Sequence, residues 1–235
     1  MFKEYKYLSH ILDNHTPTYG NEYNISISLS HDMKNGAIAN ESYINTTTHI
    51  GTHIDLPYHF HKEGQTIEMY EASFWIFNCP ILINIDPKDE IIKDELINKI
   101  ELLSLDKNID LLMIKTGIEK HRGTKRFWAE NPGFSSDVYH YLVQKFPKLR
   151  AFGFDSISLT SYKHPLIGRE AHQAFLNPKH PLLIIEDMHL NTLSENEKIS
   201  QIIIAPIRIA KCDGMPCTII ATIQSKKRSQ TNETE

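Results

Sequence analysis

A chain of 235 residues, of which 40% are hydrophobic and 23% charged, is long and apolar enough to bury a sizeable core, which excludes a wholly disordered or fibrous protein. Its net charge of −4 and its pI of 6.3 provide no general electrostatic attraction to nucleic acid or to an anionic membrane. We therefore expect a single globular domain over residues 1–224 that acts on a small molecule.

The predicted elements alternate between strands and helices along the chain. Strands are expected where short apolar or alternating runs are bounded by turn residues, and helices where apolar residues recur at helical spacing after a capping or acidic residue. In chain order, these are strands at 25–29 and 81–85, a helix at 88–103, a strand at 111–115, a helix at 135–146, a strand at 151–154, a helix at 170–176, and strands at 182–185, 202–205 and 218–222. The order predicts an α/β protein with a mixed sheet and flanking helices. The polar residues 225–235 are expected to form a disordered tail.

The cysteines and the lengths of the apolar runs indicate in which cellular compartment the protein is expected. The cysteines at positions 79, 212 and 217 are odd in number and form no Cys-x-x-Cys pair, so neither a disulfide framework nor a thiolate zinc site is expected. The first residues lack the apolar stretch of a secretory signal, and every apolar run is far shorter than the roughly 20 residues that span a bilayer. We expect a cytoplasmic protein without a membrane segment.

A cluster of potential metal ligands stands out among the 13 histidines. Five such residues fall within thirteen positions: His49, His53, Asp55, His59 and His61. Odd-numbered residues share one face of an extended strand, which leaves mostly apolar residues on the other face. At roughly 3.3 Å per residue, however, the first two histidines of a straight strand would lie about 13 Å apart, too far to share one ion. We therefore predict a bend at Gly51, because glycine adopts backbone angles that other residues avoid.

The donor types in this cluster favour catalysis over a structural metal site. Two imidazoles, from His49 and His53, and the carboxylate of Asp55 leave positions open on a divalent ion, whereas structural zinc sites are usually closed by thiolates. Nitrogen and oxygen donors suit zinc, manganese or iron. His59, two residues after Pro57, becomes a candidate proton carrier beside the ion. The alternative is that these are surface histidines of a histidine-rich chain.

The same segment resembles a known family. The pattern His49-x-Gly-Thr-His53-x-Asp55-x-Pro-x-His59-Phe resembles the signature of the cyclase-type metal hydrolases, which include bacterial kynurenine formamidase (arylformamidase) and isatin hydrolase. Supporting segments follow in order along most of the chain: Leu8-Ser9-His10, Lys115-Thr116-Gly117, Pro132-Gly133-Phe134-Ser135, Gly153-Phe154-Asp155-Ser156-Ile157-Ser158, Ala205-Pro206-Ile207-Arg208 and Asp213-Gly214-Met215-Pro216.

The resemblance implies a complete site and a fold. It makes His49, His53 and Asp55 metal ligands and His59 the catalytic acid/base, and it adds His172 and Glu186 to the site. Asp55 would bridge the ions where two are bound; zinc is expected, with manganese as the alternative. The implied fold is the swivelling β/β/α type, assembled as a homodimer or homotetramer. One departure is a longer segment between His172 and Glu186, with residues 177–181 as the extra loop.

The resemblance also implies an activity. We expect hydrolysis of an amide C–N bond in a small aromatic formamide or cyclic amide. The alternatives are a metal-assisted lyase or cyclase acting on a related carbonyl compound, and a non-catalytic binding protein with this fold. The remaining histidines are interpreted as structural, for His10, or as polar surface and loop groups, for His61, His164, His180 and His189. The aromatic residues Tyr58, Phe60, Trp75 and Trp128 are interpreted as core or interface residues, although a flat aromatic substrate would need such walls.

Overall fold

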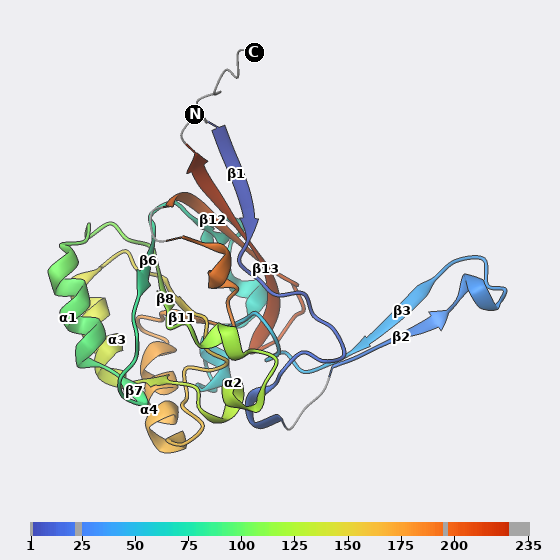
Figure 1. Cartoon of the computed structure of the whole chain (residues 1–235), viewed down its shortest axis with the longest axis horizontal. Helices are drawn as coiled ribbons and strands as arrows, with labels where there is room; N and C mark the ends of the chain where they lie inside the picture. The colour runs from blue at the N-terminus through green and yellow to red at the C-terminus, as the bar shows by residue number, and fades with distance from the viewer. Residues whose placement is uncertain (1, 22–24, 195–196, 226–235) are drawn as a thin grey trace, which may run out of the picture.

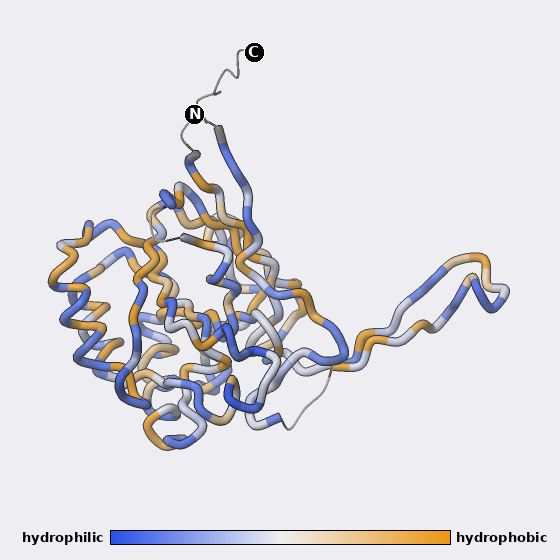
Figure 2. Tube along the Cα trace, viewed as in Figure 1, coloured by the Kyte–Doolittle hydropathy of each residue, from blue (hydrophilic) through white to orange (hydrophobic). Residues whose placement is uncertain are grey.

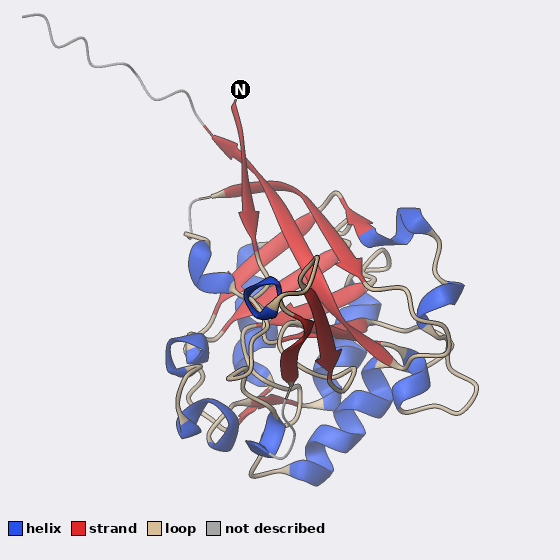
Figure 3. Cartoon of the chain, turned by 90° about the vertical axis from the view of Figure 1, so that its right-hand side faces the viewer, coloured by secondary structure: helices blue, strands red, loops and turns tan. Residues whose placement is uncertain are grey.

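The centre of the computed structural model is a mixed nine-stranded sheet. The structure describes residues 2–21, 25–194 and 197–225. Along the sheet the strand order is β5-β12-β13-β4-β11-β10-β8-β6, and β1 pairs with β13 outside this path. The sheet curls into a nearly closed barrel, because β12 also approaches β6 (Figure 3).

One half of the sheet consists of parallel strands that the sequence predicts closely. They are β6 (Pro80–Asn84), β8 (Leu111–Lys115), β10 (Ala151–Phe154) and β11 (Leu183–Glu186), and each is parallel to its neighbour in the order β6-β8-β10-β11. Their apolar runs are nearly continuous because both faces of a parallel sheet are covered. In β8, for example, Leu111 and Met113 face the barrel interior, whereas Leu112 and Ile114 pack against the helices.

The other half of the sheet is antiparallel. It contains β1 (Phe2–Tyr7), β4 (His53–Asp55), β5 (Ile76–Phe77), β12 (Lys198–Pro206) and β13 (Gly214–Ser225). The two long strands β12 and β13 extend beyond their predicted bounds, because they pair with each other over almost their whole length. Ser225 belongs to β13, which corrects the first residue of the predicted tail; residues 226–235 lie outside the described part of the chain.

Three helices cover one face of the parallel strands (Figure 1). They are α1 (Asp94–Leu103), α3 (Ser136–Lys145) and α4 (Pro165–Phe175); the short α2 (Lys125–Ala129) contacts two 3-10 helices instead. Further 3-10 helices lie in the loops: η1 (Tyr19–Asn21), η2 (Met33–Asn35), η3 (Pro57–His59), η4 (Ile67–Met69), η5 (Ala72–Trp75), η6 (Ile118–His121) and η7 (Leu190–Thr192). None of the described helices has the length and apolar character needed to cross a bilayer.

Two helix boundaries differ from those predicted. The predicted helix 88–103 begins only at Asp94, because Ile91–Ile92 form a strand, β7, that pairs with β9 (Gly133–Phe134). This pairing holds the backbone carbonyl of Ile92, which accepts from the Ser135 N–H at 3.1 Å. The predicted helix 170–176 begins earlier, at Pro165, whose restricted φ suits the first turn.

A hairpin projects from the body of the molecule. Its strands, β2 (Ser26–His31) and β3 (Glu41–Asn45), pair only with each other, and we call this hairpin the arm (Figure 1). Hydrophobic residues recur along the arm (Figure 2), and exposed side chains include Leu29, Tyr43 and Ile44. The predicted α/β class with a mixed sheet and flanking helices is confirmed, whereas the finer assignment to the swivelling β/β/α type remains a prediction.

Candidate metal centre

The short strand β4 positions the first part of the site. It lies between β11 and β13, and its His53 is the register partner of Glu186 on β11. Side chains two residues apart share a face of a strand, so His53 and Asp55 point the same way, whereas Ile54 packs in the barrel interior. The sheet pairing thereby brings together donors that are far apart in the sequence.

The bend predicted at Gly51 is confirmed. Gly51 has a φ of 57°, in the left-handed region that glycine adopts readily. The turn brings the rings of His49 and His53 to a centroid separation of 5.2 Å. A Cβ atom at Gly51 would lie only 2.3 Å from Cδ2 of Leu12, so the Leu12 side chain would have to shift to admit a larger residue.

His49, His53 and Asp55 form a first group of donors. Nδ1 of His49 lies 2.8 Å from Oδ1 of Asp55, and Nε2 of His53 lies 3.2 Å from the same oxygen. The His53 ring is oriented by its Nδ1, which donates to the Gly51 carbonyl oxygen at 2.9 Å. Its Nε2 is buried without a hydrogen-bond partner, as expected for a nitrogen that serves as a ligand.

Asp55, His172 and Glu186 form a second group. Nε2 of His172, on α4, lies 3.7 Å from Oδ2 of Asp55 and 3.5 Å from Oε1 of Glu186. Nδ1 of His172 donates to the Gly168 carbonyl oxygen at 2.9 Å, which leaves Nε2 for the carboxylates. Across residues 177–181, the segment interpreted as an extra loop, α4 and β11 bring His172 and Glu186 together.

The carboxylate of Glu186 is itself held in place. Its Oε1 accepts from the Leu159 N–H at 2.7 Å and from the Ser158 hydroxyl at 3.2 Å. The donor atoms within each of the two groups lie within 4.8 Å of one another, and Asp55 belongs to both. Asp55 is therefore placed next to both groups, and its role as a bridge between two ions stays a prediction.

Asp213 is a site residue to which the sequence analysis assigned no role. Its Oδ2 lies 2.9 Å from Nε2 of His49 and 3.0 Å from Nδ1 of His59, and the two rings stack with their centroids 3.9 Å apart. The Asp213-Gly214-Met215-Pro216 segment was a signal for it, but only the tertiary structure shows its contacts. Gly214 is needed beside it, because a Cβ there would lie 2.5 Å from Cε1 of His49.

The electrostatics of the site favour a bound cation. Burial lowers the pKa of His49, but Asp55 and Asp213 outweigh burial and raise it to about 10. Burial is likewise outweighed by neighbouring carboxylates at His53 and His172, whose pKa values are raised. The negative charge of the carboxylates is therefore stabilised by nearby positive charge. Without a metal, the protonated histidine rings provide that charge. The donor set of three imidazoles and two carboxylates fits a divalent ion that would replace those protons.

A cavity of about 440 Å³ opens onto these groups. His49, His59, His172 and Glu186 line it, together with wall residues that include Pro17, Tyr19, Phe60 and Ile157. The Phe60 ring stacks on His172 with centroids 4.8 Å apart. Phe60, interpreted as a core or interface residue, packs against the hydrophobic core and also forms part of the cavity wall that an aromatic substrate would need.

Comparison with known proteins places the chain in a family. The family model "Cyclase: Putative cyclase" matches residues 7–161, about two thirds of the chain. The protein therefore belongs to the Cyclase family. The matched range contains the segment from His49 to His59 but ends before His172 and Glu186, whose place in the site rests on the geometry described above.

The chain is also similar to individual proteins of known name. The chain is 25% identical to the kynurenine formamidase of Bacillus cereus, over 89% of this chain and 92% of that protein. It is 26% identical to cyclase-like protein 2 of Arabidopsis thaliana, over 82% and 68% of the two chains. Isatin hydrolase A from Labrenzia aggregata shares the fold with a TM-score of 0.80, at 17% identity over 95% and 94% of the chains.

Proposed function

We propose that this protein is a metal-dependent hydrolase of the amide C–N bond in a small aromatic formamide or cyclic amide. The observation that carries the proposal is the pair of donor groups that share Asp55 at a cavity also lined by His59. The similarity to a kynurenine formamidase over most of both chains supports the substrate class.

The proposed ligands are His49, His53, Asp55, His172 and Glu186, and they would hold one or two divalent ions, with zinc preferred and manganese as the alternative. An ion bound there would supply Lewis-acid activation of a carbonyl oxygen and of water. The side chains of Asp213, Ser158 and the backbone of Leu159 keep the ligands in position through the hydrogen bonds described above.

His59 is the proposed proton carrier. Asp213 accepts a hydrogen bond from Nδ1 of His59, so the lone pair is on Nε2. In the proposed reaction Nε2 takes a proton from the water whose oxygen adds to the carbonyl carbon. The same nitrogen returns that proton to the amide nitrogen as the C–N bond breaks, which yields a carboxylic acid and an amine.

The cavity walls suit an aromatic substrate. Tyr19, Phe60 and Ile157 provide apolar surface next to the donor groups. A volume of about 440 Å³ lies within the range of small-molecule sites and accommodates a substituted aromatic ring with a formamide group. Aromatic walls would bind a flat ring by stacking or edge contacts.

Purified protein with measured metal content, assayed with N-formylkynurenine, isatin and formanilide, tests the proposal. We expect a product heavier than the substrate by one water for isatin, and formate release for the formamides. Products whose masses sum to that of the substrate, with no water added, would indicate a cyclase or lyase reaction instead. Metal-loaded protein that converts none of these compounds would contradict the proposed substrate class.

The role of His59 is tested by His59→Ala. This variant is expected to keep its metal content and lose most of its turnover, by a factor of about 100 or more, as for the loss of a general acid–base. The matched control is His61→Ala, which removes another histidine of the same segment. The Nε2 of His61 is engaged with the backbone, where it donates to the Gln173 carbonyl oxygen at 3.0 Å. An undiminished kcat in His59→Ala would refute its role.

A further inference from the structure

A second cluster of imidazole and carboxylate donors lies outside the proposed centre. It consists of His10, in the segment after β1, Glu119 on η6, and His189, which precedes η7. One donor atom from each residue lies within 4.8 Å of the others. We propose that these three residues bind a divalent transition-metal ion, with zinc as the best match to two imidazoles and one carboxylate.

The position of His10 supports this site. Its Nε2 is buried and has no hydrogen-bond partner, although the side chain is 13% exposed. The nitrogen faces two carboxylate oxygens, Oε1 of Glu119 at 3.6 Å and Oδ1 of Asp187 at 3.7 Å. Both distances exceed a hydrogen bond. Two ligands of a tetrahedral zinc ion, with bonds of about 2.1 Å, are separated by about 3.4 Å, so the spacing is close to that of ligands around one ion.

His189 supplies the third donor. Its Nδ1 contacts Oε1 of Glu119, and its ring lies against the ring of His10 with centroids 4.6 Å apart. In the metal-free protein this contact is a hydrogen bond that the imidazole donates. An ion that binds between the two groups takes the lone pair of Nδ1, so the single proton of the neutral His189 ring is then carried by Nε2.

The charge balance of the cluster also calls for a cation. Asp187 is compensated by Arg122, whose Nε and Nη2 donate to its carboxylate at 2.9 and 2.7 Å. Glu119 is only 3% exposed, and it is contacted by His189 and by the Asn191 N–H at 2.8 Å, neither of which carries a permanent charge. With neutral imidazoles the cluster has a net charge of −1, which is costly in a buried place. A divalent ion at Glu119 supplies the missing positive charge.

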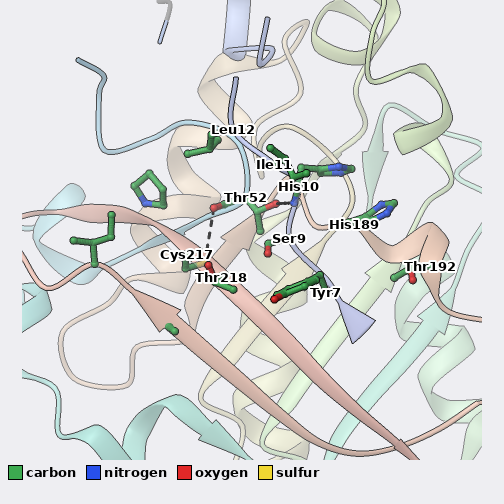
Figure 4. Close-up of a pocket in the computed structure, with 13 residues that line it drawn as sticks. Tyr7, Ser9, His10, Ile11, Leu12, Thr52, His189, Thr192, Cys217 and Thr218 are labelled. Carbon is green, nitrogen blue, oxygen red and sulfur yellow. Dashed lines mark hydrogen bonds between the residues drawn. The ribbon is translucent and has the colours of Figure 1, made fainter. Parts of the chain in front are cut away.

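An open hollow of about 810 Å³ gives an ion access from solvent. Figure 4 shows His10 and His189 next to each other on its wall, with Thr52 hydrogen-bonded to His10. The His189 side chain is 39% exposed, so its ring can be reached without opening the fold. Because the protein provides three ligands, the remaining position on the ion faces this hollow and is open to water or a further ligand.

The backbone connects this cluster to the proposed catalytic centre. The Thr52 hydroxyl accepts from the His10 N–H at 2.9 Å and donates to the Asp187 carbonyl oxygen at 2.5 Å. Thr52 precedes His53, and Asp187 follows Glu186. An ion held by His10, Glu119 and His189 therefore stabilises the segments that position two ligands of the catalytic centre.

The experiment measures zinc binding in the full chain, with and without the catalytic centre. Asp55→Asn removes the carboxylate shared by both catalytic groups, and this variant is expected to keep one tightly bound zinc ion per chain. Adding His189→Ala should lower the affinity for that remaining zinc ion by more than about 100-fold, because the loss of even an outer-sphere partner lowers metal affinity by 10- to 100-fold. Glu119→Gln in the same background should have the same effect. The matched control is His31→Ala, because His31 and Glu41 form an exposed pair on the arm.

A thermal melt provides a second measurement that does not depend on activity. Zinc should raise the Tm of Asp55→Asn but not that of Asp55→Asn/His189→Ala, in which the exposed position of residue 189 favours correct folding. Equal zinc stoichiometry, affinity and Tm shift with and without His189 would overturn the proposal. Because this comparison is made without the catalytic centre, it is independent of the proposed hydrolase activity.

Discussion

Replacing Asp213 with asparagine changes one carboxylate that contacts two imidazoles of the proposed site. Its Oδ2 accepts from Nε2 of His49 at 2.9 Å and from Nδ1 of His59 at 3.0 Å. An asparagine side chain keeps one oxygen that can accept a hydrogen bond, but it has no negative charge and its amide nitrogen is a donor. Because both imidazoles donate to the same oxygen, Asp213→Asn is expected to weaken or break both of these charge-assisted hydrogen bonds.

The expected magnitude follows from that loss. A hydrogen bond to a charged group contributes about 1.5–3 kcal/mol. If the bond to His59 is lost in the transition state, kcat should fall about 10- to 150-fold. The hydrogen bond to His49 orients a proposed metal ligand, so its loss should lower the affinity for the metal ion by about 10- to 100-fold. Saturating metal should therefore restore the metal content of Asp213→Asn but not its kcat.

The assay is formanilide or N-formylkynurenine turnover at saturating zinc or manganese, with metal content measured on the same sample. The control is Glu68→Gln, because Glu68 accepts from the Lys211 N–H at 3.0 Å in the loop that precedes Asp213 and contacts neither imidazole. A kcat of Asp213→Asn within about twofold of the wild type would refute the reasoning that this carboxylate orients His59.

Three further outcomes are expected. Gly51→Ala should lower the free energy of unfolding by at least about 1–3 kcal/mol, because the residue has positive φ and its Cβ would overlap Leu12; an unchanged denaturant midpoint would contradict this. In metal-free protein burial lowers the pKa of His49, but Asp55 and Asp213 outweigh it and raise the pKa from 6.5 to about 10, so the stability that this histidine contributes is fully present below pH 6.5 and should be lost as the pH rises to about 10. Denaturant titrations across this range should show less pH dependence when metal is bound. Chelation should abolish hydrolysis and zinc or manganese should restore it, and chelated protein that keeps full activity would refute metal dependence.

The local parts of the fold and site were accessible from the sequence. Buried parallel strands such as β8 were predicted within a residue, because a continuous apolar run between turn residues has few alternatives. The spacing of His49, His53 and Asp55 required a bend, and Gly51 was the residue able to provide it. These inferences depend on backbone geometry over a few residues, which the local sequence determines.

Some errors arose where pairing with distant residues overrode a local pattern. The residues before α1 have helical apolar spacing, yet Ile91 and Ile92 pair with Gly133 and Phe134, and backbone hydrogen bonds to a neighbouring strand exclude a helix there. Local propensity is a weak influence compared with such tertiary pairing.

The sequence by itself determined the cluster of candidate ligands around Gly51 and the α/β pattern of elements. Only the tertiary structure decided that Asp213 contacts both His49 and His59, and that His10 approaches Glu119 and His189. The physical reason is that these contacts form between segments whose approach depends on how the barrel closes and on the register of β4 between β11 and β13. The number of residues between two positions in the sequence does not determine how far apart they lie in the folded protein.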